Sequence, residues 1–174
     1  MKLALFGLHR GPSIDPHAMA RLARLAEEAG FEALWVGDHI ALPVDQGDAA
    51  YQPRLEALVA LTYLAAVTTR VRLGAGVIIL PQRQPVLLAK QLASIDVLSG
   101  GRLTVGFGVG YMEAERDGCS AAGLWAGPAR GRVRSAVWRR ATTDMARLLG
   151  RFGVSRPASR RGPPTRLCRV VPMA

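Results

Sequence analysis

The chain has 174 residues, of which 49% are hydrophobic, and it carries a formal net charge of +10. That length favours one domain with a core of its own. No run of about 18 apolar residues occurs and the first residues lead directly into Gly7 and His9, so neither a membrane span nor a secretory signal is expected. Cys119 and Cys168 stand far apart without CxxC spacing or a nearby histidine. No metal site is therefore predicted, and a reducing, cytoplasmic setting is favoured.

The positive charge is confined to the last third of the chain. Residues 1–115 contain 10 Lys and Arg against 11 Asp and Glu, whereas residues 116–174 contain 13 Arg and only two acidic residues, Asp117 and Asp144. The second segment also lacks Lys, Glu, Gln, His, Ile and Tyr. Two parts of different composition are therefore predicted to meet near Glu115.

In the first part, short apolar runs alternate with stretches of helical periodicity. The runs are nearly continuous in apolar residues, as is typical of strands buried on both faces, and lie at 3–8, 33–37, 71–80 and 103–107. Such repeats of about 30 residues predict right-handed βαβ units in a parallel sheet, an α/β fold. The pattern leaves a doubly wound sheet and a closed barrel both open.

The helices between these runs have clear start and stop signals. The first is predicted to have Asp15 as N-cap and Pro16 at its first position, and to end at Gly30. The second opens after Pro53, and the third opens at Pro85 and stops at two glycines.

A polar pair, Asp38 and His39, follows the second predicted strand, where parallel α/β folds place their chemistry. The pair could bind a polar ring and move a proton, because histidine titrates near neutral pH. The alternative is structural, with Asp38 bonding turn amides and His39 covering an apolar edge, and the dipeptide alone favours it. His9 is expected at the rim of the same site, and Glu27 on a solvated helix face.

Glycines interrupt the third and fourth predicted strands. Gly74 and Gly76 lie inside a strand, where glycine costs about 0.5–1 kcal/mol relative to alanine. They indicate a bulge or a ligand against the backbone, or else close packing of strand and helix. The later run GFGVGY resembles a phosphate-binding turn but lacks GxGxxG spacing and the acidic residue about 20 positions on, so it is not a Rossmann fingerprint.

Three motifs in this order resemble the bacterial luciferase-like family of flavin-dependent monooxygenases and deazaflavin-dependent oxidoreductases. They are AEEAGFEALWVGDH at 26–39, TTRVRLGAGVIILPQRQPVLLAKQLASIDVLSGGR at 68–102 and LTVGFGVGY at 103–111. The resemblance covers residues 1–115 and implies a (β/α)8 TIM barrel.

The resemblance also implies roles for individual residues. Asp38 would orient the ring of a deazaflavin and His39 would handle a proton of the substrate, so these two are the predicted catalytic pair. A bulge with a non-prolyl cis peptide behind the ring matches Gly76 and Val77. Further cofactor contacts would come from the turn after the fourth strand, formed by Gly108, Val109, Gly110 and Tyr111.

The implied activity is that of an oxidoreductase moving a hydride between a small organic substrate and the cofactor. The protein's share is to hold the ring against the substrate and to exclude water. The pair of Asp38 and His39 favours coenzyme F420, a deazaflavin. FMN is the alternative, and it would permit monooxygenase chemistry because a deazaflavin does not activate oxygen as a flavin does.

A full barrel takes about 250 residues, and only four βα units precede residue 116. The later Arg-, Pro- and Gly-rich composition is that of a GC-rich gene read in another frame. A frameshifted or truncated product is therefore predicted, with the switch between Glu113 and Gly118. Open sheet edges would favour aggregation, or a homo-oligomer of half barrels that complete each other's sheet.

The basic tail suggests a non-catalytic alternative. Apolar and Arg residues recur at helical spacing over 132–150, and such a helix could bind an anionic membrane surface or nucleic acid. An accidental pattern is favoured over this interpretation, so a nucleic-acid partner is not expected. The run 155–164 is predicted to be disordered. The chain is thus expected to be an oxidoreductase impaired by truncation, or a fragment without catalysis.

Overall fold

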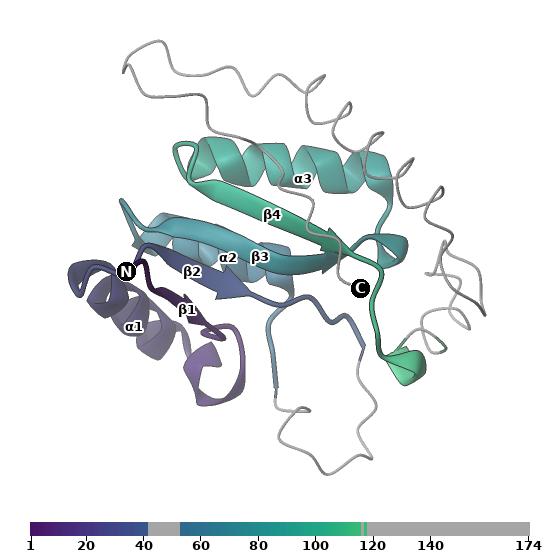
Figure 1. Cartoon of the computed structure of the whole chain (residues 1–174), viewed down its shortest axis with the longest axis horizontal. Helices are drawn as coiled ribbons and strands as arrows, with labels where there is room; N and C mark the ends of the chain where they lie inside the picture. The colour runs from purple at the N-terminus through teal and green to yellow at the C-terminus, as the bar shows by residue number, and fades with distance from the viewer. Residues whose placement is uncertain (42–52, 116, 118–174) are drawn as a thin grey trace.

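A computed structural model describes residues 1–41, 53–115 and 117 (Figure 1). Within them strands and helices alternate, as the sequence predicts. The strands are β1 (Ala4–Phe6), β2 (Ala33–Val36), β3 (Arg72–Ile79) and β4 (Leu103–Gly108). The helices are α1 (Pro16–Glu28), α2 (Ala57–Val67) and α3 (Pro85–Leu98). Two short 3₁₀ helices follow β1 and β3, at Gly11–Ile14 and Leu80–Gln82.

Local capping sets the start of α1 and α3. The Asp15 carboxylate accepts a hydrogen bond from the backbone N of Ala18 at 2.8 Å, which confirms the predicted N-cap of α1. Gln84 does the same for α3, accepting from the backbone N of Leu87 at 2.6 Å. Helix α3 ends before Gly100, whose φ of +69° favours glycine. Both helices therefore begin where the sequence predicts.

Helix α2 begins later than predicted, because the residues after Pro53 bond to the end of β1. Leu55 donates its backbone N–H to the carbonyl oxygen of His9 at 2.8 Å. Arg54 forms an isolated antiparallel bridge with Arg10. This segment is therefore extended, and Glu56 caps the helix after it through its side chain.

The strand order decides between the two architectures. All neighbouring strands are parallel and their order in the sheet is β1, β2, β3, β4. Each strand thus lies beside the next one in sequence, with a helix in every connection, so the chain winds in one direction. A doubly wound sheet would instead reverse around its first strand. The described elements are the first three βα units and the fourth strand of a barrel, which confirms the predicted fold class.

The three helices pack on one face of this sheet. In Figure 1, α2 lies behind β3, so the opposite face of the sheet points toward the viewer. The largest fully buried apolar side chains of this single cluster are Met19 in α1, Leu61 and Leu64 in α2, Leu88 and Leu92 in α3, and Leu34, Leu73, Ile78 and Phe107 in the strands. Burying a side chain of this size stabilises the fold by about 1.5–3 kcal/mol. This face therefore supplies the core.

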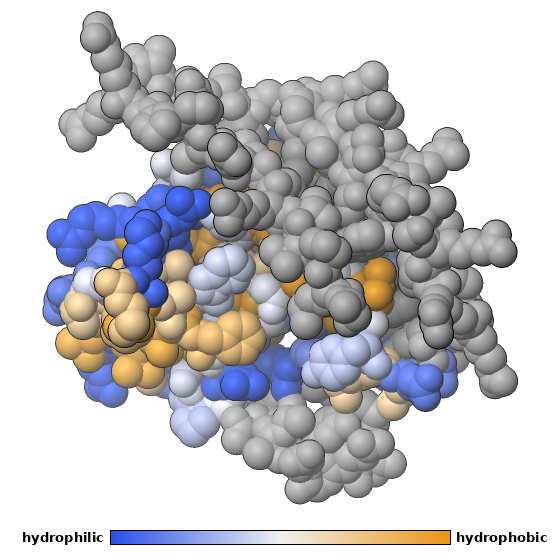
Figure 2. All heavy atoms as spheres, in the orientation of Figure 1, coloured by the Kyte–Doolittle hydropathy of each residue, from blue (hydrophilic) through white to orange (hydrophobic). Residues whose placement is uncertain are grey.

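On the face of the sheet opposite these three helices, strand glycines make room for neighbouring side chains. A Cβ on Gly74 would lie 2.5 Å from the Trp35 ring, and a Cβ on Gly106 would lie 3.3 Å from a methyl carbon of Val77. Close packing thus explains Gly74, although its partner comes from the adjacent strand rather than from a helix. Figure 2 shows apolar and hydrophilic side chains next to each other on the described part of this side of the molecule.

The predicted tail features lie outside the described residues. These are the helix at 132–150, the disordered run at 155–164 and, apart from residue 117, the whole second part from 116 to 174. Among the helices that the structure describes, none is long and apolar enough to cross a membrane.

Candidate functional site

Polar side chains gather where the strands end, beginning with His9 after β1. His9 is only 1% exposed, and its Nε2 accepts from the backbone N of Gly37 at 3.2 Å, so its ring proton lies on Nδ1. Burial, followed by the positive charges of Arg54 and Arg10, lowers the pKa of His9 to about 4. The sequence analysis predicts that His9 lies at the rim of the site. The structure shows a neutral, internal residue that ties the end of β1 to the end of β2.

Asp38 ties the end of β2 to the end of β3. Its side chain is fully buried and forms an ion pair with the Arg83 guanidinium, which also lies 2.7 Å from an oxygen of Glu56. The second carboxylate oxygen of Asp38 accepts from the backbone N of Ile79 at 2.9 Å. Burial raises the pKa of Asp38, while Arg83 beside it acts in the opposite direction. Both oxygens are thus engaged within the protein, and the predicted contact with a cofactor ring stays a prediction.

His39 is held by a residue that the sequence analysis did not place in the site. Oε2 of Glu115 lies 2.7 Å from Nδ1 of His39, and Oε1 accepts from the backbone N of Ile40 at 2.8 Å. The Gln82 side chain forms a further hydrogen bond with this carboxylate. Burial acts to raise the pKa of Glu115, but the bonds from His39 and Ile40 outweigh it and lower the pKa.

These bonds define the protonation pattern of the imidazole. With its lowered pKa, Glu115 is a carboxylate at neutral pH and can only accept hydrogen bonds. Nδ1 of His39 must therefore carry a proton. In the neutral ring, Nε2 then bears the lone pair. The His39 side chain is 14% exposed, so the arrangement presents a proton acceptor at the edge of a buried cluster.

The glycine signal in β3 corresponds to a bulge. The pairing of β3 with β4 shifts register between Ala75 and Ile78. The peptide bond between Gly76 and Val77 is cis, as the resemblance implies. The bulge interpretation is therefore confirmed, while contact of Gly76 and Val77 with a cofactor stays a prediction.

The turn after β4 lies next to His39. The ring of Tyr111 meets the ring of His39 edge-on, with centroids 6.0 Å apart, and Tyr111 is 82% exposed. Gly110 has a φ of +75°, a conformation that favours glycine. A Cβ on Gly108 would clash with the Val77 side chain. The structure thus brings the predicted catalytic histidine together with the predicted cofactor turn.

Sequence reasoning found the adjacent pair but missed its partners. Arg83, Glu56 and Glu115 all lie just after a strand or just before a helix, at the same edge of the sheet. The charges of Arg83 and Glu115 complement those of Asp38 and of a protonated His39, and Glu56 pairs with Arg83; that complementarity was the available signal. Within the described part of the chain, no group of three His, Cys, Asp or Glu side chains could hold a metal ion.

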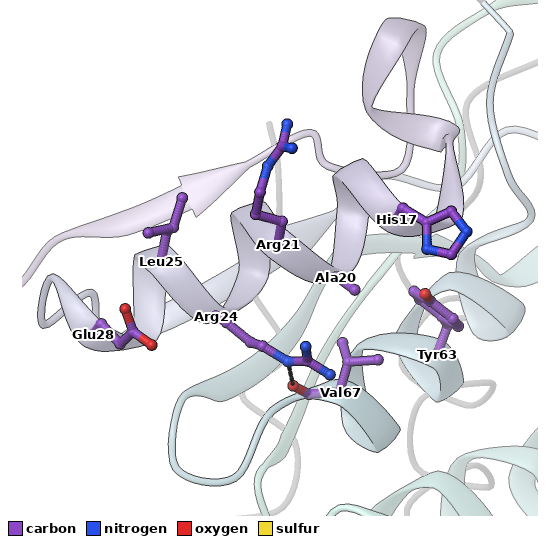
Figure 3. A pocket seen from close by; sticks show the side chains of 8 residues that line it. All are labelled: His17, Ala20, Arg21, Arg24, Leu25, Glu28, Tyr63 and Val67. Carbon is purple, nitrogen blue, oxygen red and sulfur yellow. Dashed lines mark hydrogen bonds between the residues drawn. The ribbon is translucent and has the colours of Figure 1, made fainter.

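A separate groove of about 430 Å³ lies between α1 and α2 (Figure 3). Arg24 crosses its floor and donates from Nε to the carbonyl oxygen of Val67 at 3.2 Å. The other lining side chains are His17, Ala20, Arg21, Leu25, Glu28 and Tyr63. None of the predicted site residues lines this groove, so it is distinct from the cluster at the strand ends.

Comparison with known proteins agrees with this architecture. A protein of Mycobacterium tuberculosis is 39% identical over 121 residues, which are 63% of this chain and 41% of the relative. The coenzyme F420 dependent tetrahydromethanopterin reductase of Methanopyrus kandleri has a structure with a TM-score of 0.53 and 28% identity, covering 68% of this chain and 30% of the reductase.

A solved structure in complex with FMN is similar to this chain in fold, at low sequence identity. It is the oxygenating constituent of 3,6-diketocamphane monooxygenase from Pseudomonas putida, with a TM-score of 0.64 and 14% identity over 85% of this chain and 40% of that protein. The chain therefore spans less than half the length of each of these three proteins.

The family profile described as luciferase-like monooxygenase matches residues 1–163. This match extends past Glu115, where the sequence analysis ends the resemblance. Since the profile covers most of the chain and the described strands follow the barrel order, the chain belongs to the luciferase-like monooxygenase family.

Proposed function

We propose that the chain carries the site of an oxidoreductase that transfers a hydride between a small organic substrate and a deazaflavin, coenzyme F420. The observation that carries this proposal is the 2.7 Å contact between Glu115 and Nδ1 of His39, which makes Nε2 the nitrogen that would act as a base beside a glycine turn at the strand ends. Strand ends are where barrel enzymes of this kind place their catalytic groups. The activity of the coenzyme F420 dependent reductase of Methanopyrus kandleri supports the same class.

The residues present fit a flat ring cofactor. An exposed aromatic ring, Tyr111, stands edge-on to His39, and the backbone beside it passes through Gly110 and Gly108, which carry no side chains. Gly76 and Val77 would lie behind the ring, and the turn of 108–111 would supply backbone contacts. When bound, the cofactor supplies the carbon that accepts or gives the hydride.

The protein's own groups manage the proton and the geometry. His39 takes the hydroxyl proton of an alcohol substrate on Nε2, and returns it in the reverse direction. Asp38, anchored by Arg83 and the amide of Ile79, fixes the backbone from which His39 projects. His9 fixes the same segment from the other side through Gly37. The base is thus held in place before substrate arrives.

The choice of cofactor decides the class of reaction. Coenzyme F420 supports dehydrogenase or reductase chemistry, whereas FMN, the alternative, would also permit oxygen activation and a monooxygenase. We favour coenzyme F420 because of the pair of Asp38 and His39. The similarity to an F420-dependent reductase supports this preference, whereas the shared fold of an FMN-containing monooxygenase keeps FMN as the alternative.

Titration of the purified full chain with each cofactor tests this choice. Fluorescence of coenzyme F420 and of FMN would be followed as protein is added. We expect saturable binding of coenzyme F420 at least about tenfold tighter than that of FMN, a difference of roughly 1.4 kcal/mol. Tighter binding of FMN would reverse the preference, and binding of neither would contradict the proposed function.

A further inference from the structure

The carboxylate of Glu115 is the buried charged group at the strand ends to which the sequence assigned no role. It is 2% exposed and lies beyond the turn that follows β4. One oxygen contacts Nδ1 of His39 and the other accepts from the backbone N of Ile40, the next residue along. The two contacts hold both the ring and its backbone, so the carboxylate fixes His39 at two points.

We propose that Glu115 is the positioning residue for His39: it selects the Nδ1–H tautomer and thereby assigns the proton-transfer role to Nε2. This inference rests on the proposed function, in which His39 acts as the base. In this role Glu115 acts through the imidazole, to which it is bonded at Nδ1.

The chemistry explains why a carboxylate is needed there. In the oxidative direction, Nε2 of His39 would take the hydroxyl proton of the alcohol substrate, while a bound deazaflavin would supply the acceptor for the hydride from the alcohol carbon, so that a carbonyl product would be left. His39 then carries protons on both nitrogens and one positive charge. The carboxylate of Glu115 stabilises that charge through the bond to Nδ1 without taking the proton itself.

The surrounding groups make the carboxylate the main charge facing His39. From the end of β1, His9 is neutral at pH 7 because its pKa is about 4. From the segment before α2, Arg54 interacts with Glu115 and with Tyr111. From the end of β3, Gln82 bonds to Glu115 and is uncharged. Asp38, adjacent in sequence, is paired with Arg83.

The tautomer of His39 in the cofactor-free chain is the first test. Nitrogen NMR of the imidazoles in the full-length protein, with His39→Gln to assign the signals, distinguishes a protonated Nδ1 from a protonated Nε2. We expect the wild-type chain to hold His39 as the Nδ1–H form at neutral pH. A predominant Nε2–H form would overturn the proposal without any variant at position 115.

Substitution of Glu115 is the second test. In Glu115→Gln the carboxylate becomes a neutral amide, so we expect both tautomers of His39 to be populated. Glu115→Asp retains the charge one methylene further away and should largely restore the Nδ1–H form, which a purely structural role would not predict. The matched control is Glu113→Gln, two positions earlier, which should leave the tautomer unchanged. A single unchanged tautomer in Glu115→Gln would refute the role of Glu115.

Turnover separates this inference from the proposed function. If the chain turns over with coenzyme F420, Glu115→Gln should lower kcat by about 10²-fold or more with little change in KM, since a wrong tautomer removes the base rather than the binding contacts. If the tautomer responds as expected but neither wild type nor variant turns over, the proposed function fails while the positioning role stands.

Discussion

At the amino-terminal end of the sheet, Arg102 and Glu27 are held mainly by backbone atoms, whereas at the carboxyl-terminal end Asp38 and His39 pair with other titratable side chains. Arg102, just before β4, donates five hydrogen bonds to Ala65, Thr68, Val71 and Ser99, and four of the five acceptors are carbonyl oxygens. Glu27 likewise accepts from three consecutive backbone amides, at 69–71.

The opposite end couples ionisable groups to one another. Asp38 pairs with Arg83, His39 pairs with Glu115, and His9 is a neutral buried ring. Backbone partners cannot change their protonation, so the amino-terminal end can only stabilise. Side-chain partners can change theirs, which is what acid–base chemistry needs. Stability is therefore expected from one end and the proposed reactivity from the other, the division that barrels of this kind show.

The largest expected effect tests reactivity at the carboxyl-terminal end. His39→Ala should lower kcat with coenzyme F420 by about 10²–10⁴-fold, because it removes the general base. The rate would be measured with the alcohol that gives the fastest wild-type turnover in a panel of small alcohols. His17→Ala, in the groove between α1 and α2, is the control and should keep the wild-type rate. A His39→Ala variant that keeps the wild-type rate would contradict the assignment of His39 as the general base.

The next effect tests stability at the amino-terminal end. Arg102→Ala should lower the free energy of unfolding by about 3 kcal/mol, since it leaves several carbonyl oxygens without their charged donor. Urea denaturation of the full chain measures this. Arg102→Lys keeps the charge but not the planar fork, so its loss should be intermediate. The exposed Arg70→Ala is the control, and a loss there as large as at Arg102 would contradict the comparison.

The pH dependence of stability should carry the signature of His9. Its folded-state pKa of about 4 lies below the ordinary 6.5, so the unfolded chain binds a proton that the folded chain excludes. The contribution is fully present above pH 6.5 and is lost as the pH falls toward 4, by about 3 kcal/mol. His9→Gln keeps an acceptor for the backbone N of Gly37. In this variant the urea concentration at the unfolding midpoint should change less with pH between these two values. An unchanged slope would show that His9 is protonated when folded.

The smallest effect is expected at an exposed ion pair of the amino-terminal end. Lys2 lies 2.8 Å from Glu32, but its side chain is 83% exposed. Lys2→Ala should therefore change the free energy of unfolding by less than about 0.5 kcal/mol, and added salt should remove even that difference. A larger loss in urea denaturation would mean that charge at this end stabilises without backbone partners.

What the sequence could predict was local. Asp15 and Pro16 define the start of α1 from adjacent positions, and the pair Asp38 and His39 is adjacent and follows an apolar strand. The start of α1 and the polar pair could be predicted because each depends only on residues that are adjacent in sequence. The partners of the pair lie 45 and 76 positions away, so no spacing rule could identify Arg83 or Glu115.

Errors arose where distant segments bond to one another. Helix α2 starts late because the backbone of Leu55 bonds to that of His9. Glu27 was predicted to be a solvated residue of a helix face, yet it binds amides 42 to 44 positions away, and these bonds outweigh desolvation to lower its pKa to about 2. Periodicity describes one element at a time and carries no information on such contacts.

The contact between His39 and Glu115 also dictates an order of assembly. It closes a loop of 76 positions, and it can form only once the chain has been synthesised beyond β4. Closure of a long loop is entropically costly and slow compared with the formation of a helix. A nascent chain can bury α1 and α2 against the first strands before Glu115 leaves the ribosome. The imidazole therefore acquires its tautomer after the core beneath it has formed.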